Sequence, residues 1–311
     1  MTQPTEPVTA VITITTITVI ARMKMILPPD EKSADLGDSH FSIEDLVDIH
    51  VHILPGLDDG AKTRDDSIAM ATIAAKCGTS RIVATPHVDP LRLRHSSQQV
   101  EIIKRAVDSL QKSIISCGLS VQVMPGMEIA MAPDLVGYLN RGEVMTVADG
   151  GKYVLIELPF QMIPSYTEQE IFNIAASGYI PIIAHPERNA SVIHNPNILI
   201  PFLKAGALAH VNADSLTGRE GPKSQKTAEI LLSHGLAHII ASDGHSSTSR
   251  QSRLDRAFEI AARLVGEDKA LKTVRDIPLA IVLGEDVSVP EPEEYKTRRK
   301  WWRIWEGRGS S

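Results

Sequence analysis

Two histidines separated by one residue stand at the end of an apolar run, and this spacing is typical of a metal site. The run, residues 46–53, reads as a buried strand that ends just before a turn rich in Pro, Gly and Asp. Because side chains two apart on a strand point the same way, His50 and His52 can present two imidazoles to one cation. Asp58 and Asp59 in the turn offer carboxylate oxygens close by. A His-x-His pair alone is a weak signal, so its interpretation depends on matching donors elsewhere.

Metal-type donors also stand at the ends of the later runs that read as strands. They are His87, Glu128, Glu157, His185, Asp243 and His245, with the less distinctive Asn212 and Asp214 after the sixth strand. One such residue is usually an ordinary hydrogen-bonded group, but a chance alignment at six of seven strand ends is improbable. All the strong donors are imidazole or carboxylate, which suits Mn, Zn or Fe. They are too many for one ion, and they predict about two or three.

Two arginines follow ligand-bearing strand ends. Arg188 comes three residues after His185, and Arg250 comes five residues after His245. Either could be an ordinary surface charge, but their positions make both candidates for bidentate binding of a phosphate. Clustered cations that acidify a bridging water and hold phosphoryl oxygens are suited to phosphoester hydrolysis. The sequence therefore favours a metal-dependent phosphoesterase.

The elements that must position these residues alternate between strand and helix. The expected strands are residues 46–53, 81–87, 121–129, 153–159, 179–187, 208–213 and 237–245. The expected helices are residues 63–77, 97–117, 133–139, 167–177, 195–205, 222–233 and 250–265. This alternation predicts an α/β fold with a parallel sheet. Repeated right-handed crossovers favour closure into a seven-stranded barrel with its site at the carboxyl ends of the strands, and an open doubly wound sheet is the alternative.

Composition excludes several classes of protein. The chain has 311 residues, of which 43% are hydrophobic and 23% charged, as in ordinary soluble globular proteins. A net charge of -6 argues against nucleic-acid binding. The two cysteines, Cys77 and Cys117, each precede a glycine at the apparent end of a helix, which suits buried thiols in a reducing cytoplasm. No apolar run reaches the length of about 18 residues that a spanning helix needs.

The two ends of the chain differ from its middle. The sequence predicts a disordered extension over residues 1–44, a metallophosphatase domain over 45–289, and a basic tail over 290–311 that holds all three tryptophans. If the tail is helical, Trp301, Ile304 and Trp305 share one face, as an interfacial membrane anchor requires. The other interpretations are a disordered tail, or one whose tryptophans pack on the domain.

Six short motifs resemble those of a known superfamily. They are H-x-H at 50–52, T-P-H at 85–87, G-x-E-I at 126–129, I-E-L-P at 156–159, A-H-P-E-R at 184–188 and A-S-D-G-H at 241–245. Together they resemble the polymerase-and-histidinol-phosphatase (PHP) superfamily, and more closely its manganese-dependent tyrosine-protein phosphatases of bacterial capsule and exopolysaccharide clusters. The stretch D-I-H-x-H-I-L-P-G-x-D-D-G at 48–60 is highly specific to that branch. The resemblance covers about residues 46–285 and implies a distorted seven-stranded, TIM-like (β/α)7 barrel, the PHP fold.

The resemblance also implies a trinuclear site, with Mn2+ as the expected ion and Zn2+ or Fe as alternatives. It groups His50, His52, Glu128 and Asp243 around one ion, Glu128, Glu157 and His185 around a second, and Asp59, His87 and His245 around a third. Glu128 would then bridge two ions. Arg188 and Arg250 match the family's phosphate pocket and, with Asp59, form the expected catalytic set.

The expected activity is that of a protein-tyrosine phosphatase in which a metal-activated hydroxide attacks phosphorus in line. The resemblance suggests a phosphotyrosyl protein as substrate, in particular the Tyr-rich tail of a bacterial tyrosine autokinase that regulates capsule and exopolysaccharide synthesis. Three alternatives stay open: a phosphatase of small esters such as histidinol phosphate or a nucleotide-like ester, an esterase or amidase, and a metal-loaded binding module without turnover. The expected location is the cytoplasm, with peripheral contact at the inner face of the membrane if the tail is an anchor. The sequence leaves an oligomer open.

Overall fold

The computed structural model describes residues 44–92 and 96–296. Its strands are β1 (Leu46–Val51), β2 (Thr79–Ala84), β3 (His87–Val88), β4 (Gln122–Pro125), β5 (Glu128–Ala130), β6 (Tyr153–Glu157), β7 (Ile180–Ala184), β8 (Leu208–Asn212) and β9 (Ile239–Ala241). Its α-helices are α1 (Arg64–Lys76), α2 (Ser96–Ser116), α3 (Leu135–Asn140), α4 (Thr167–Ala176), α5 (Ala190–His194), α6 (Ile200–Lys204), α7 (Ala213–Leu216), α8 (Pro222–Ser233), α9 (Asp255–Val265), α10 (Glu267–Leu271) and α11 (Ile277–Val282). The expected extension, except residue 44, and the tryptophans of the tail lie outside the described residues.

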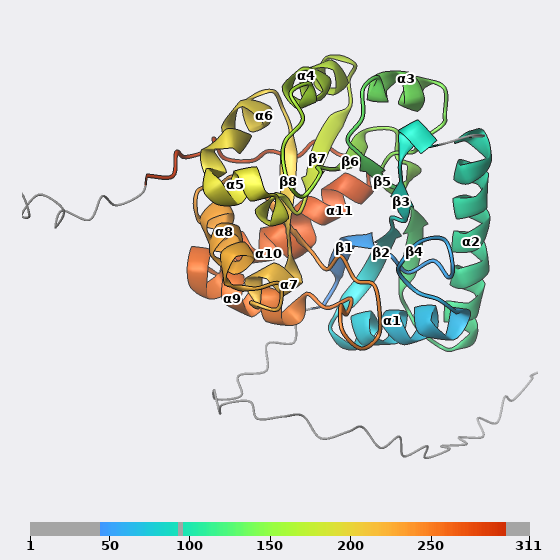
Figure 1. Cartoon of the computed structure of the whole chain (residues 1–311). Coiled ribbons are helices and arrows are strands. Elements are labelled where there is room, and N and C mark those ends of the chain that lie inside the picture. Colours follow the sequence, from blue (N-terminus) through green and yellow to red (C-terminus); the bar gives the residue numbers. More distant parts are fainter. Residues whose placement is uncertain (1–43, 93–95, 297–311) are drawn as a thin grey trace, which may run out of the picture. The chain divides into compact units, whose positions relative to one another are not determined.

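The strands pair in parallel and form two sheets. One sheet has the order β1-β2-β4, and the other has the order β3-β5-β6-β7-β8-β9. An isolated parallel bridge between Val51 and Gly244 links the end of β1 to the segment after β9. Nearby, the amide of Ser242 donates a 3.0 Å hydrogen bond to Asp48 Oδ1. The prediction of an α/β fold with parallel strands is confirmed (Figure 1), while closure into a seven-stranded barrel stays a prediction.

Two of the expected strands are each interrupted near a proline. The strand expected over residues 81–87 is two strands, β2 and β3, separated by Thr85 and Pro86, and the one expected over residues 121–129 is β4 and β5. Proline cannot donate to the ladder, and a Cβ on Gly126 would lie 2.7 Å from Val83 Cγ1, so only glycine fits this close approach. After the interruption β3 pairs with β5, and His87 lies opposite Glu128.

Alternate side chains of the strands pack into two apolar cores. On β6, Val154 and Ile156 belong to the larger core, which includes residues of α1, α4, α8 and α9. Tyr153 and Leu155, which point to the other face of the strand, pack with Ile281 of α11 in the smaller core. Figure 1 shows α11 amid the strands and helices such as α1, α2, α4 and α6 outside them. Helix α11 was not among the helices expected from the sequence.

Helix α1 fixes the turn that precedes it. A capping box begins this helix: Thr63 Oγ1 accepts from the amide of Asp66, and Asp66 Oδ2 accepts from the amide of Thr63 at 2.9 Å. The turn with Asp58 and Asp59 is therefore held between β1 and a well-capped helix. Within residues 44–92 and 96–296, no helix combines the length and the apolar character that a membrane span requires.

Candidate metal centre

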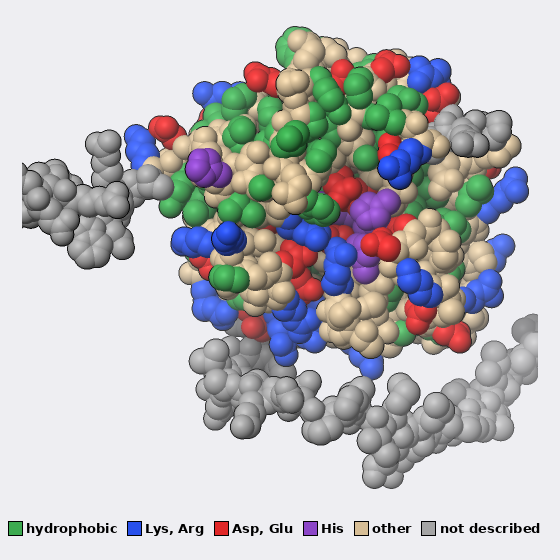
Figure 2. Space-filling model, in the orientation of Figure 1, with side chains coloured by type: hydrophobic (Ala, Val, Ile, Leu, Met, Phe, Trp, Pro, Cys, Tyr) green, Lys and Arg blue, Asp and Glu red, His purple; other side chains and the backbone are tan. Residues whose placement is uncertain are grey.

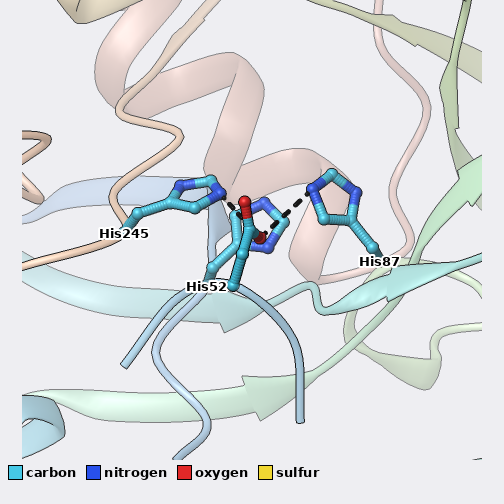
Figure 3. Close-up of side chains that lie close together, drawn as sticks. His52, His87 and His245 are labelled. Carbon is cyan, nitrogen blue, oxygen red and sulfur yellow. Dashed lines mark ion pairs between the residues drawn. The ribbon is translucent and has the colours of Figure 1, made fainter. Parts of the chain in front are cut away.

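The nine predicted ligand residues lie together where the strands end. His50 is on β1, His87 begins β3, Glu128 begins β5 and Glu157 ends β6, while His52, Asp59, His185, Asp243 and His245 stand in the segments just after strands. Figure 3 shows the rings of His52, His87 and His245 facing one another from separate segments. In Figure 2, histidines reach the surface between acidic and basic side chains. The structure therefore brings together donors far apart in the sequence.

Four overlapping groups have ligand atoms within 4.8 Å of one another. They are His52, Asp59, His87 and His245; His50, Glu128 and His185; His50, His52 and Asp243; and His87, Glu128 and Glu157. The first group contains Asp59, His87 and His245, the residues expected from the sequence around the third ion, together with His52. The other two expected sets are spread over the remaining groups, because Glu128 and His50 each contact several neighbours.

Glu128 is the centre of this cluster and has no exposed surface. Its Oε1 lies 2.9 Å from Nε2 of His185. Its Oε2 lies 2.9 Å from Nδ1 of His87, 3.1 Å from Nε2 of His50 and 3.2 Å from Nε2 of His52. No hydrogen bond to Oε2 forms among the described residues, although three imidazole nitrogens surround it. A buried carboxylate oxygen with such neighbours fits a bridging ligand between cations.

The charges of the cluster shift the pKa values of its members strongly. Burial alone would raise the pKa of Glu128, but the charge of His50 and the hydrogen bond with His185 hold it well below its usual range. Burial alone would lower the pKa of His185, but Glu128 raises it to about 9. Burial also opposes protonation of His52, yet Asp243 and Asp58 raise the pKa of His52 well above the ordinary value. The buried carboxylates are therefore stabilised by positive charge nearby, which cations of a metal site would supply.

Asp243 connects the histidines to the two predicted arginines. Its Oδ1 lies 3.3 Å from Nε2 of His52 and 3.5 Å from Nε2 of His50. Its Oδ2 accepts hydrogen bonds from Nη1 of Arg188 at 3.0 Å and from Nη2 of Arg250. Because the side chains of both arginines are about a quarter to a third exposed, they can also contact a bound anion.

Two close contacts require glycine beside the cluster. A Cβ on Gly60 would lie 2.0 Å from the carbonyl oxygen of His52, and a Cβ on Gly244 would lie 2.3 Å from Oγ of Ser252. His185 and Asp243 themselves have left-handed backbones, with φ of 30° and 52°. Such a conformation is uncommon for residues with a side chain, and at these two positions it coincides with the candidate site.

Two residues of the cluster were not among the ligands expected from the sequence. Asp58 Oδ2 lies 2.6 Å from Nδ1 of His52, so this carboxylate orients the imidazole. His210 on β8 is fully buried, and its Nε2 lies 2.8 Å from Nδ1 of His50. The sequence pattern indicated Asp58 only as a nearby oxygen donor. A signal for His210 was its place two residues before Asn212 on a strand, the same spacing as between His50 and His52.

Two surface hollows beside the cluster share Phe160 as a lining residue. The first, of about 290 Å³, is lined by His87, Glu128 and Glu157, together with Val88, Asp89, Ala130 and Phe160. The second, of about 390 Å³, is lined by Phe160, Gln161, Arg188, Ala190, Glu220 and Ser224. The candidate metal centre is thus open to a substrate on one side, and an arginine that contacts Asp243 reaches the neighbouring hollow.

Comparison with known proteins identifies several relatives. The chain is 32% identical over 255 residues to tyrosine-protein phosphatase YwqE of Bacillus subtilis (strain 168), covering 82% of this chain and 98% of the relative. It is 32% identical over 259 residues to the putative tyrosine-protein phosphatase CapC of Staphylococcus aureus, covering 83% and 100%. It is 28% identical over 247 residues to tyrosine-protein phosphatase CpsB of Streptococcus pneumoniae, covering 77% and 99%. The resemblance seen in the sequence motifs is confirmed.

A solved structure and a family description agree with these relatives. The fold is similar to one from the crystal structures of YwqE of Bacillus subtilis and CpsB of Streptococcus pneumoniae, described as unique metal-dependent tyrosine phosphatases. The TM-score is 0.76 at 31% identity, and the match covers 81% of this chain and 100% of that one. Residues 46–283 match the family described as capsular polysaccharide synthesis, CpsB/CapC. The chain therefore belongs to the CpsB/CapC family of capsular polysaccharide synthesis.

Proposed function

We propose that this protein is a metal-dependent protein-tyrosine phosphatase. The observation that carries the proposal is the position of Asp243, whose two oxygens contact metal-type histidines on one side and two arginines on the other. A phosphoryl group needs both kinds of partner, since cations and arginines together neutralise its oxygens. The names of the relatives support phosphotyrosine as the group that is hydrolysed.

The donor set suits about three cations, and manganese is the ion we propose, with Zn2+ or Fe as alternatives. The proposed ligands are the nine residues expected from the sequence: His50, His52, Asp59, His87, Glu128, Glu157, His185, Asp243 and His245. When bound, the cations supply Lewis acidity and lower the pKa of bound water. Glu128 would contribute a ligand oxygen beside His185 and another beside His87, because its two oxygens face these imidazoles.

Arg188 and Arg250 bind and orient the phosphate in this proposal. Both guanidinium groups are fixed by Asp243 before any substrate arrives, so less side-chain entropy is lost when they contact phosphoryl oxygens. The leaving phenolate has a conjugate acid with a pKa of about 10, so a strong general acid is less necessary than for an alkyl phosphate. Asp59 is largely exposed at the edge of the site and completes the proposed catalytic set.

The proposed substrate is a phosphotyrosyl protein, and the family's link to capsule synthesis favours a bacterial tyrosine kinase of that process. We further propose a cytoplasmic location, with membrane contact through the tryptophan-rich tail, most of which lies outside the described residues. Co-sedimentation with lipid vesicles, comparing the full chain with a chain that ends at Pro290, tests this contact. Equal pelleting of the two chains would refute it.

The finer architecture is also part of the proposal. A closed seven-stranded barrel over residues 45–289 is supported by the bridge between Val51 and Gly244, which links the first strand to the segment after the last. A crystal structure that shows continuous pairing around all strands would establish the barrel, and an open edge would exclude it.

Phosphate release from chelator-stripped protein tests the activity. Mn, Zn or Mg is restored singly, and rates are measured on phosphotyrosyl and phosphoseryl peptides, histidinol phosphate and nucleoside phosphates. We expect manganese to restore fast hydrolysis of phosphotyrosine, and Glu128→Ala and His185→Ala to abolish it. Preference for a small ester would replace the proposed substrate, whereas absence of turnover with every metal would favour a binding module.

A further inference from the structure

We propose that Phe160 contacts the phenyl ring of the phosphotyrosine and selects it over phosphoserine. This inference rests on the proposed phosphatase function and adds to it the residue that recognises the side chain of the substrate. Its basis is an exposed aromatic ring, on a fixed loop, between the metal-type donors and one of the arginines.

The backbone around Phe160 is held in place although the side chain is 43% exposed. The carbonyl of Phe160 accepts a 2.8 Å hydrogen bond from the amide of Ala190. Nδ2 of Asn189 donates to the carbonyls of Pro159 at 2.6 Å and Met162 at 3.2 Å, so the loop is tied on both sides of the ring. An aromatic group presented on such a fixed backbone loses little conformational entropy when a ligand packs on it.

Phe160 lines both hollows. The first hollow contains His87, Glu128 and Glu157, where the cations and the phosphorus of a substrate would lie. The second contains Arg188. Among the described residues that line either hollow, Phe160 is the only phenylalanine, tyrosine or tryptophan. Figure 2 shows apolar side chains on one side of the histidine-bearing opening and basic side chains at several points around it.

The Phe160 ring lies against Arg188, a proposed phosphate-binding residue, and His185, a proposed metal ligand. The guanidinium carbon of Arg188 lies 4.7 Å from the centre of the Phe160 ring, and the ring of His185 stacks at 5.9 Å. A phosphate held by Arg188 and the cations therefore places the next part of the substrate beside Phe160. In phosphotyrosine that part is a phenyl ring, which can pair with Phe160, whereas phosphoserine offers only a methylene group.

The test compares Phe160→Ala and Phe160→Tyr with wild type, all loaded with manganese. For each, kcat/KM is measured on phosphotyrosyl and phosphoseryl peptides of the same sequence, and inhibition constants are measured for phenylphosphonate and inorganic phosphate. We expect Phe160→Ala to lower kcat/KM for phosphotyrosine and to weaken inhibition by phenylphosphonate, each by about two- to tenfold, the range for one aromatic pair. The inhibition constant of inorganic phosphate should stay unchanged, and Phe160→Tyr should restore the wild-type values. Phe172→Ala, which removes an exposed ring from α4, is the matched control and should change nothing.

Each alternative result has a distinct meaning. If Phe160→Ala weakens inorganic phosphate as much as phenylphosphonate, Phe160 only supports Arg188 and the inference is wrong. Equal inhibition by phenylphosphonate in wild type and Phe160→Ala also overturns it, while leaving the phosphatase proposal intact. If wild type hydrolyses small alkyl esters but not phosphotyrosine, both the proposed function and this inference are wrong.

Discussion

Nδ1 of His52 lies 2.6 Å from Oδ2 of Asp58. Asp58 is itself fixed, because its Oδ1 accepts a hydrogen bond from the amide of Gly60 at 2.8 Å. Burial alone would raise the pKa of Asp58, but His52 keeps it below the usual value, so the carboxylate stays charged. This contact directs the other ring nitrogen of His52 toward Glu128 and Asp243, and Asp58 therefore acts on the proposed cations through the imidazole.

Replacing Asp58 by asparagine should weaken the proposed metal site without unfolding the protein. The amide fills the same space but no longer fixes the tautomer and basicity of His52, and loss of such a partner typically costs about 10–100-fold in metal affinity or activity. Manganese titration by calorimetry, together with phosphate release, measures both. Asp65→Asn, an exposed change in the first turn of α1, is the control. Wild-type affinity in Asp58→Asn would contradict the orienting role.

Removal of the metal should destabilise the fold. The buried carboxylates of Glu128 and Asp243 would lose the cations that offset their charge, and a ligand at a hundred times its dissociation constant stabilises a fold by about 2.7 kcal/mol. We expect Tm to fall on chelation and to recover with manganese. Glu128→Gln should show a much smaller change in Tm between these states. If chelation leaves the wild-type Tm unaltered, the cluster does not hold cations in the folded protein.

Substitution of either arginine should reduce catalysis and spare metal binding. In Arg188→Lys and Arg250→Lys the positive charge remains but the two-pronged contact with the phosphate and Asp243 is lost. We expect kcat/KM to drop on the order of a hundredfold, as for the loss of one preorganised donor in a transition-state site. Metal content should match wild type. Arg219→Lys, at a more exposed arginine paired with Asp214, is the control, and a loss of equal size there would argue against a special role.

The pH dependence of stability should contain a contribution from His238. Burial lowers the pKa of His238 from 6.5 to about 4, and its Nδ1 accepts a hydrogen bond from the amide of Ala209. Below pH 6.5 the unfolded chain therefore binds a proton that the folded chain does not, and the free energy of unfolding falls as the pH drops toward 4. Above pH 6.5 this contribution is constant.

Urea unfolding of His238→Asn across this pH range measures the contribution. Asparagine keeps an acceptor near Ala209 and does not titrate. The free energy of unfolding of wild type minus that of the variant should therefore fall by on the order of 3 kcal/mol as the pH drops from 6.5 to about 4. His194→Asn, at an exposed histidine, should preserve the wild-type slope. An unchanged slope in His238→Asn would show that this histidine is not the cause.

The sequence predicted which donors come together at the candidate site better than it predicted the bounds of the strands. His-x-His spacing, Pro/Gly turns and repeated donors are local signals, and they located the nine candidate ligands. The breaks at Thr85–Pro86 and near Gly126 coincide with proline and glycine, but the close approach of Gly126 to Val83 is apparent only in the fold. Helix α11 packs on an inner face that exists only after the sheets form.

The residues missed at the site were missed for a similar reason. His210 lies within an apolar run, where a histidine is more often an ordinary core residue, and only its 2.8 Å approach to His50 gives it a role. Asp58 and Asp59 are adjacent in the sequence, but the fold gives their side chains different partners. Asp58 contacts Nδ1 of His52, whereas Asp59 faces His87 and His245. The left-handed backbone of His185 likewise follows from the tertiary structure.

The hydrogen bond from Ser242 to Asp48 joins positions 194 residues apart, so the order of synthesis separates the two halves of the site in time. At about 5–20 residues per second, β1 leaves the ribosome on the order of 10–40 s before its partners after β9. During that interval His50 and His52 lack Asp243, the residue that also positions both arginines. A nascent chain therefore cannot bring all the proposed ligands together until the segment after β9, which holds Asp243 and His245, has been synthesised.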